Sequence, residues 1–260
     1  MQPAMRVTWV GHSTVLIELD GVRLLTDPVV RPRVAHLLRV GGRADVAALD
    51  DLDAVLISHL HYDHLDLASL KRLGRTVPLV VPTGAGKLLR GRGFSRVAEV
   101  DVGDEESVGT LTVRATPAEH DGSRGPFRAR GPAVGYLVTG SARVYFAGDT
   151  DLFEDMRSLA PGLDVALLPV AGWGLRVPPG HLTPRRAAEA LQLLRPRVAV
   201  PIHWGTYRGF GIGRDAAVLR APAEDFVRFA GELAPETDVR LVPVGGTLEL
   251  LVPRVEEVSP

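Results

Sequence analysis

The sequence of 260 residues predicts an α/β fold, and two observations support this prediction. Short apolar or β-branched runs, typical of buried strands, recur along the whole chain. From residue 67 onward these runs alternate with segments of helical pattern, which indicates strands layered against helices. We find no clean repeat, low-complexity tract or linker, so we predict that residues 1–260 form a single domain.

The chain opens with three predicted strands, over residues 7–10, 14–19 and 22–26. Gly11 separates the first two, and Asp20-Gly21 separates the second from the third. Because Asp-Gly between such runs is a strong hairpin signal, the chain is expected to begin as a β-meander. His12 falls in the first turn, where a lone histidine is more often structural, and its role stays open at this point.

Residues 27–50 lack a regular pattern and accumulate basic side chains. A loop of this length is often a lid or a binding loop, and the alternative is a solvated, arginine-rich surface. Both interpretations stay open from the sequence. The basic residues and the histidine of this segment are Arg31, Arg33, His36, Arg39 and Arg43.

A predicted buried strand, residues 53–58, leads directly into His59-Leu60-His61-Tyr62-Asp63-His64. In an extended backbone His59 and His61 project from the same side, and Asp63 and His64 follow as the chain turns. Imidazole and carboxylate groups suit Zn²⁺ or a similar divalent ion. Histidine runs also occur in surface tails, but those do not follow a core strand, so the cluster predicts a metal site.

The remaining elements alternate between helix and strand. Predicted helices cover residues 67–73, 83–90, 152–159, 183–194 and 223–233. Predicted strands cover residues 79–81, 96–100, 111–115, 133–138, 143–146, 165–169, 198–200, 239–242 and 248–252. Thr183 as an N-cap and Pro184 at the first helical position mark the start of the fourth helix.

Four further polar residues lie just after predicted strands or in the loops that follow them: His120, Asp149, His181 and His203. Function concentrates in loops at one edge of a rigid sheet. Any one of these histidines alone would more often be a structural or surface residue. Their shared position after strands favours a common site.

These motifs, in this order, resemble the metallo-β-lactamase superfamily. Residues 59–64 match its His-x-His-x-Asp-His signature. Residues 9–14 (Trp-Val-Gly-His-Ser-Thr), 25–28 (Leu-Thr-Asp-Pro), 147–150 (Ala-Gly-Asp-Thr) and 201–206 (Pro-Ile-His-Trp-Gly-Thr) resemble one branch of it. That branch contains N-acylphosphatidylethanolamine phospholipase D and ascorbate-phosphate lactonase-type proteins, and the likeness is greatest to the phospholipase. The resemblance covers about residues 7–206.

The resemblance implies an αβ/βα sandwich: two mixed sheets packed together, with helices outside and metals at one sheet edge. It also implies two metal sites, formed by two groups of ligands and one bridging carboxylate. The first group is His59, His61 and His120, the second is Asp63, His64 and His203, and Asp149 is the bridge. His181 takes the place of a histidine that lies near the substrate in the phospholipase.

The implied chemistry is metal-dependent hydrolysis. Two divalent ions about 3.5–4 Å apart can share a hydroxide and lower its pKa. We expect Zn²⁺, with Mn²⁺ or Fe²⁺ as alternatives. Asp63 is a candidate proton acceptor, and His181 could hydrogen-bond an anionic group, protonate the leaving oxygen, or be an idle loop residue. His12, Asp27 and Thr150 are candidates for fixing the imidazole tautomers.

The substrate stays open. We favour a small, anionic phosphodiester or related phosphate ester, and the alternative is a lactone or another carboxylic ester. The Gly- and Pro-rich loop over residues 172–180 gives no clear alignment. An oxidoreductase on the same fold is disfavoured because flavodiiron relatives carry Glu in place of His61. Seven intact ligands argue against a non-catalytic binding module, and no extra motif suggests a nuclease.

The composition and the sequence pattern argue against several classes of protein. A net charge of −1 gives no support for nucleic-acid binding. The hydrophobic content of 45% is ordinary, no apolar run approaches membrane-spanning length, and residues 1–11 do not resemble a secretory signal. The chain has no cysteine, so disulfides and thiolate metal sites are excluded. We expect a cytoplasmic protein, and a homo-oligomer stays open.

Overall fold

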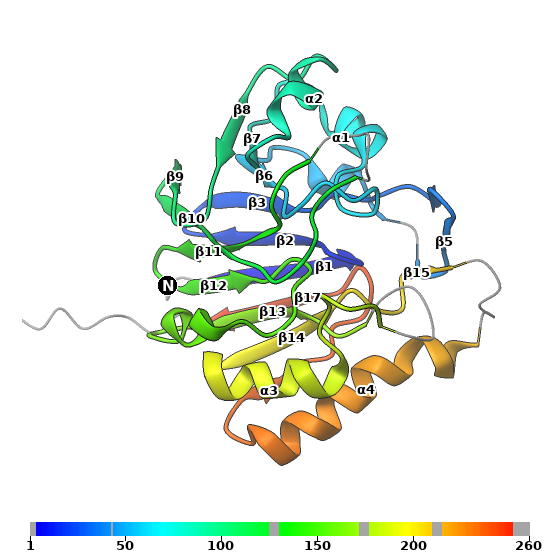
Figure 1. Ribbon diagram of the computed structural model, residues 1–260, viewed down its shortest axis with the longest axis vertical. Helices are drawn as coiled ribbons and strands as arrows, with labels where there is room; N and C mark the ends of the chain where they lie inside the picture. The colour runs from blue at the N-terminus through cyan, green and yellow to red at the C-terminus, as the bar shows by residue number, and fades with distance from the viewer. Residues whose placement is uncertain (1–3, 43, 125–129, 172–176, 210–214, 252–260) are drawn as a thin grey trace, which may run out of the picture.

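Two seven-stranded sheets dominate the computed structural model, which describes residues 4–42, 44–124, 130–171, 177–209 and 215–251. The sheets face each other, with helices on their outer sides (Figure 1). Each sheet is mixed, because one half of it is antiparallel and the other half is parallel. The predicted αβ/βα sandwich is therefore confirmed.

The first sheet has the strand order β17-β1-β2-β3-β6-β7-β8. Its strands are β1 (Ala4–Gly11), β2 (Thr14–Leu19), β3 (Val22–Thr26), β6 (Ala54–Leu56), β7 (Leu79–Pro82), β8 (Val97–Val100) and β17 (Thr247–Leu251). The predicted Asp20-Gly21 hairpin joins β2 and β3, and both turn residues have positive φ, at 51° and 80°. This pair of conformations is the one that a two-residue hairpin turn of the right twist requires.

The second sheet has the strand order β16-β14-β13-β12-β11-β10-β9. Its strands are β9 (Glu105–Val108), β10 (Leu111–Pro117), β11 (Val134–Thr139), β12 (Arg143–Phe146), β13 (Val165–Pro169), β14 (Val198–Ile202) and β16 (Asp238–Val239). The parallel strands β12, β13 and β14 carry almost continuous apolar residues, as strands buried on both faces do.

Hydrophobic side chains from both sheets form the central core. Met5, Val7 and Trp9 alternate inward along β1, and they meet residues such as Val113 and Phe146 of the second sheet. Burying a side chain such as Val7 or Phe146 stabilises the fold by roughly 1.5–3 kcal/mol. The two sheets thus hold each other in place and fix the positions of the loops at their edges.

The helices form the two outer layers (Figure 1). The first sheet is covered by α1 (Leu67–Leu73) and α2 (Gly86–Arg90), whose leucines join its outer core. The second sheet is covered by α3 (Pro184–Leu194), α4 (Ala216–Leu233) and the 3₁₀ helix η2 (Glu154–Leu159). Thr183 caps α3 as predicted, since its hydroxyl accepts a hydrogen bond from the Arg186 backbone at 3.3 Å.

Several predicted elements differ from the structure. The helix predicted over 83–90 begins only at Gly86. The segment predicted as a helix over 152–159 is a 3₁₀ helix that starts at Glu154, and the N-cap residue Phe153 provides no side-chain hydrogen bond to it. Helix α4 starts seven residues before the predicted 223, because it tolerates Pro222 in its interior. The strand predicted over 239–242 pairs only through Asp238–Val239.

The segment 27–50 is partly ordered into strands. A small sheet contains β4 (Arg33–Val34), β5 (Leu37–Arg39) and β15 (Tyr207–Arg208), and a 3₁₀ helix η1 (Ala47–Leu49) follows. The guanidinium of Arg39 donates to the carbonyls of Val10 and Gly42 at 2.6 and 2.7 Å. This part of the segment is therefore fastened to the first sheet and to the loop after β14.

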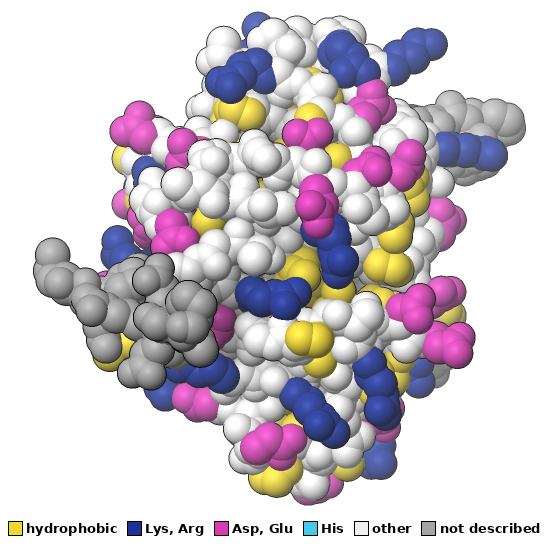
Figure 2. Space-filling view, turned by 90° about the vertical axis from the view of Figure 1, so that its left-hand side faces the viewer, with side chains coloured by type: hydrophobic (Ala, Val, Ile, Leu, Met, Phe, Trp, Pro, Cys, Tyr) yellow, Lys and Arg dark blue, Asp and Glu magenta, His cyan; other side chains and the backbone are white. Residues whose placement is uncertain are grey.

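Acidic and basic side chains are interspersed on the face shown in Figure 2, and no histidine appears there. No helix within the described residues is long and apolar enough to cross a membrane. The histidines gather at the opposite edge of the sandwich.

Candidate metal centre

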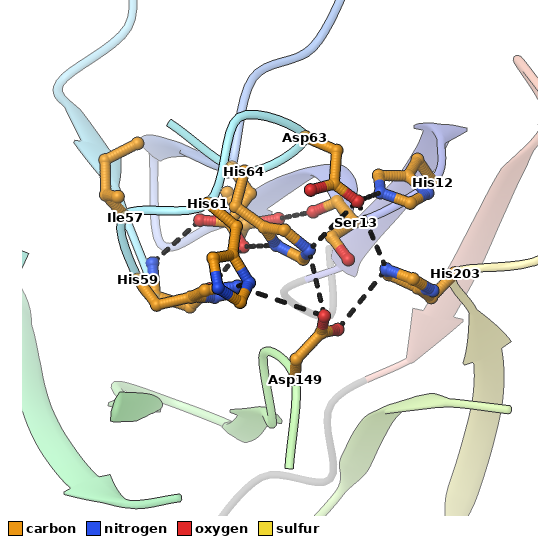
Figure 3. A network of polar contacts seen from close by, with 12 residues as sticks. His12, Ser13, Ile57, His59, His61, Asp63, His64, Asp149 and His203 are labelled. Carbon is orange, nitrogen blue, oxygen red and sulfur yellow. Dashed lines mark hydrogen bonds and ion pairs between the residues drawn. The ribbon is translucent and has the colours of Figure 1, made fainter. Parts of the chain in front are cut away.

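Loops that follow strands of both sheets converge at one edge of the sandwich (Figure 3). From the first sheet come the turn after β1, the loop after β3 and the histidine-rich loop after β6. From the second sheet come the loops after β10, β12, β13 and β14. Of the chain's eight histidines, all except the exposed His36 lie here: His12, His59, His61, His64, His120, His181 and His203.

The first group predicted from the sequence is brought together by the structure. Nδ1 of His61 lies 3.0 Å from Nε2 of His59 and 3.2 Å from Nε2 of His120. Tetrahedral Zn–N bonds place neighbouring ligand nitrogens about 3.3 Å apart. The three nitrogens therefore surround a point at which a cation of this size fits.

The second predicted group is also assembled. Oδ2 of Asp63 lies 3.8 Å from Nε2 of His64 and 4.0 Å from Nε2 of His203. Neither of these buried nitrogens makes a well-directed hydrogen bond to the described residues, although Oδ2 of Asp149 lies 3.1 Å from Nε2 of His64. A buried polar atom without a partner costs free energy, and a cation between the three side chains would satisfy both nitrogens.

Asp149 lies between the two groups. Its Oδ2 is 3.1 Å from Nε2 of His64 and 3.9 Å from Nε2 of His59, and its Oδ1 is 3.4 Å from Nε2 of His203. Oδ1 is buried and forms no hydrogen bond with any residue that the structure describes. The neighbouring Gly148 has φ of +61°, and a Cβ there would lie 2.6 Å from Cβ of Ser58. Glycine thus lets the Asp149 loop approach the strand end that carries the histidines.

Hydrogen bonds on the far side of the rings fix which nitrogen faces the centre. Nδ1 of His120 donates to the Gly180 carbonyl at 2.9 Å, and Nδ1 of His203 donates to the Ala171 carbonyl at 2.7 Å. A carbonyl only accepts, so each Nδ1 carries the proton and each Nε2 presents a lone pair inward. This arrangement is typical of metal-binding histidines.

Asp27 orients two histidines of the first sheet in a similar way, one directly and one through Ser58. It accepts hydrogen bonds from Nδ1 of His64 at 2.7 Å and from the Ser58 hydroxyl at 2.5 Å. Because the Ser58 hydroxyl donates to Asp27, its oxygen accepts from Nδ1 of His59 at 2.9 Å. The predicted supporting role of Asp27 agrees with this geometry. Ser58 was missed, although a hydroxyl directly before the first histidine was a usable signal.

The other two predicted supports do not bond an imidazole. Thr150 accepts from the backbone of Glu119 at 2.8 Å and donates to the Asp151 carbonyl at 2.7 Å, so it ties the His120 loop to the Asp149 loop. His12 contacts a carboxylate instead, with Nε2 3.1 Å from Oδ2 of Asp63.

The charges of the site follow from burial and from this packing. Burial lowers the pKa of His120 to about 4 and that of His203 to about 3, so both rings stay neutral near pH 7. Burial alone would lower the pKa of His64, but the carboxylates of Asp149 and Asp63 outweigh it and raise that pKa well above the usual value. Burial likewise opposes ionisation of the two aspartates, yet the surrounding imidazoles hold their pKa values below the usual range.

His181 is brought to the same centre by the start of α3. Its Nε2 lies 3.3 Å from Oδ2 of Asp149, and its Nδ1 lies 3.2 Å from the Pro179 carbonyl. Its side chain is 12% exposed, whereas that of His203 is 1% exposed. His181 therefore borders the centre on the side that solvent reaches. Residues 172–176 of the preceding loop lie outside the described residues.

Known proteins share this sequence pattern. A family model described as the beta-lactamase superfamily domain matches residues 22–204. A metal-dependent hydrolase of Methanopyrus kandleri is 33% identical over 255 residues, covering 94% of this chain and 100% of the relative. An N-acyl-phosphatidylethanolamine-hydrolyzing phospholipase D of Caenorhabditis elegans is 33% identical over 226 residues, covering 77% of this chain and 64% of the relative.

Some relatives are longer than this chain. Uncharacterized mycobacterial proteins are 36% identical over 223 residues, and the match spans 59% of their length. Among solved structures, a metallo hydrolase of Ignicoccus hospitalis superposes with a TM-score of 0.72 at 25% identity, covering 95% of this chain and 98% of the other.

Proposed function

Because the chain belongs to the metallo-β-lactamase superfamily, we propose that it is a metal-dependent hydrolase that cleaves a phosphodiester or related phosphate ester at a centre of two divalent ions. The resemblance read from the sequence motifs is thereby confirmed at the level of the superfamily. We propose, beyond the family, how many ions are bound, what individual residues do and which substrate is cleaved.

One observation carries the proposal: two groups of ligand atoms flank a single buried carboxylate. Asp149 reaches His59 of one group and both histidines of the other, which is the position of a bridge. The donor set consists of imidazole nitrogens and carboxylate oxygens, which suits Zn²⁺, with Mn²⁺ or Fe²⁺ as alternatives. Two such ions, when bound, supply an activated water and polarise the ester.

The protein's own residues have separate tasks in this proposal. Asp149 fixes the spacing of the two groups. Asp63 serves first as a ligand, because its lowered pKa keeps it ionised, and it is also the candidate acceptor for a proton released at the centre. His181 faces the open side, where it would bind the anionic group or protonate the leaving oxygen. Burial lowers its pKa, but Asp149 more than compensates, so the pKa of His181 is raised.

The phosphate ester is favoured over a carboxylic ester by the nematode relative, whose name describes cleavage of a phospholipid by a phospholipase D. The centre itself would also polarise a lactone carbonyl, so a lactonase is the second candidate. In both cases we infer a small-molecule, anionic substrate.

The test is turnover of a panel of chromogenic phosphodiesters and lactones by protein reconstituted separately with Zn²⁺, Mn²⁺ and Fe²⁺. We expect metal-dependent cleavage of phosphodiesters that exceeds cleavage of lactones. Faster turnover of the lactones would replace the first candidate with the second. A metal-loaded protein that cleaves neither class would contradict both candidates.

A further inference from the structure

His12 lies against the second ligand group, although no motif assigns it to either metal. Its imidazole is buried, and its Nε2 lies 3.1 Å from Oδ2 of Asp63 (Figure 3). The same oxygen is the Asp63 atom that faces His64 and His203. His12 thus contacts a proposed ligand at the atom that would bind the ion.

The ring positions distinguish a support from a further ligand. Two imidazoles on one tetrahedral zinc ion have ring centres roughly 5 Å apart, given the length of Zn–N bonds. The rings of His64 and His203 meet this condition, with centroids 5.3 Å apart. The His12 ring centroid is also 5.3 Å from that of His64, but it lies only 3.9 Å from that of His203, with planes inclined by 37°. This distance is shorter than that between two imidazoles on one ion, so the His12 ring packs, tilted, against a ligand.

The backbone of His12 is held firmly in the conformation that aims the ring. Its φ of 57° lies in the left-handed region, which non-glycine residues rarely adopt. Its N–H donates to the Thr206 hydroxyl at 2.8 Å. Its carbonyl accepts from the backbone of His203 at 3.0 Å and from the indole of Trp9 at 2.8 Å. His12 is therefore tied to the loop that carries one ligand while its side chain reaches another.

We propose that His12 is a positioning residue whose Nε2–H donates to Oδ2 of Asp63 and thereby orients this oxygen for the second metal ion. A carboxylate oxygen has two lone pairs, so one accepts from His12 while the other faces His64 and His203. The inference rests on the proposed dinuclear centre. It adds a group that sets the affinity of one ion without touching it.

Zinc titrations of two variants test this role. His12→Leu introduces an apolar side chain of similar size and so removes the Nε2–H donor. His12→Gln instead places an amide N–H near the position of Nε2. We expect His12→Leu to weaken the second binding event by about 10–100-fold and to leave the first unchanged. His12→Gln should restore most of the loss. His61→Ala identifies the first event, because it removes a ligand of that group only.

Three results would overturn the inference. Unchanged zinc affinities in His12→Leu would show that the donor is dispensable. Equal losses in both variants would show that only the imidazole ring matters. If both variants lost the second zinc-binding event as completely as His203→Ala does, His12 would be a ligand.

A measurement on the unmodified, zinc-loaded protein covers the case in which a variant does not fold. Nitrogen-15 spectra of the histidine rings should show a proton on Nε2 of His12, and a bare Nε2 would overturn the inference. The proposed dinuclear centre fails separately, and earlier, if the unmodified protein takes up fewer than two ions.

Discussion

The carboxylate of Asp27 lies 2.7 Å from Nδ1 of His64, and through the hydroxyl of Ser58 it also supports His59. One buried side chain therefore orients one imidazole in each ligand group. The strand end at Thr26 and the histidine-rich loop are held together by the same contacts, because the Ser58 backbone donates to Asp27 at 2.7 Å.

Asp27→Asn should weaken zinc binding at both groups by about 10–100-fold, because one carboxylate oxygen becomes an NH₂ that cannot accept a hydrogen bond. That NH₂ would face either the Ser58 backbone N–H at the Oδ1 position or, at the Oδ2 position, the Ser58 hydroxyl and Nδ1 of His64. Competition against a chromophoric chelator measures the two affinities. Asp51→Asn is the matched control, since Asp51 is exposed and belongs to no ligand group. Unchanged affinities in Asp27→Asn would contradict the supporting role.

Elemental analysis of the reconstituted protein should give two ions per chain. The expectation rests on two separate groups of inward-facing ligand atoms with Asp149 between them. A single tightly bound ion after reconstitution with each candidate metal would contradict the dinuclear centre.

Asp149→Ala should lower turnover by roughly 10²-fold or more, since correctly spaced ions contribute several kcal/mol to transition-state stabilisation. The fold should survive, because the sheets bury a core that does not include this residue. Circular dichroism checks the fold and steady-state kinetics the loss. His36→Ala, in the exposed turn between β4 and β5, should retain normal turnover. Near-normal turnover of Asp149→Ala would refute the bridging role.

His181→Ala should lower turnover by about 10²–10⁴-fold if this residue protonates the leaving oxygen, while the metal content stays at two. A substrate whose leaving group needs no proton should restore most of the rate in the variant. Loss of metal would instead make His181 a ligand, and unaltered kinetics would make it an idle loop residue.

The two groups should differ in their response to pH. In the metal-free chain the raised pKa of His64 keeps a proton on a nitrogen that the ion needs, so binding at the second group must displace it. Affinity at that group should therefore rise about tenfold per pH unit up to that pKa. The lowered pKa values of His59, His61 and His120 leave the first group largely free of such competition.

Calorimetry at pH 6.5 in buffers of different ionisation enthalpy measures this difference. The second binding event should release about one proton more than the first. The measurement is made at pH 6.5 because zinc-bound water ionises only near pH 7 and would otherwise add protons of its own. Equal proton release in the two events would contradict the assignment of a protonated His64.

Sequence patterns located most of the proposed ligands because each follows a strand that was recognisable by itself. The strands before His59 and His203 are short, apolar and bounded by polar residues, so the ligands could be placed at the edge of a sheet. The family resemblance, carried by the order of the motifs, then assigned the ligands to the two groups. The structure brings the members of each predicted group together.

Features that depend on distant parts of the chain could not be read in this way. Strand β5 pairs with the two residues of β4 beside it and with Tyr207 and Arg208, about 170 residues further along. The local hairpin is too short to give a strand pattern in residues 27–50, and the distant partner has no local sign. The carbonyls of Ala171 and Gly180 orient two histidines through backbone atoms, which carry no residue signature. The hydrogen bond from His12 to Asp63 likewise depends on how the first turn meets the histidine-rich loop.

Each ligand group takes side chains from both sheets: His120 joins the histidines after β6, and His203 joins Asp63 and His64. Ions bound there would bridge the sandwich, and their binding energy would add to the cohesion of the whole fold. At a free metal concentration 100 times Kd, each site would raise the free energy of unfolding by about 2.7 kcal/mol. Amide hydrogens in both sheets would then exchange more slowly, and chelation would loosen the sheets together with the site that they form.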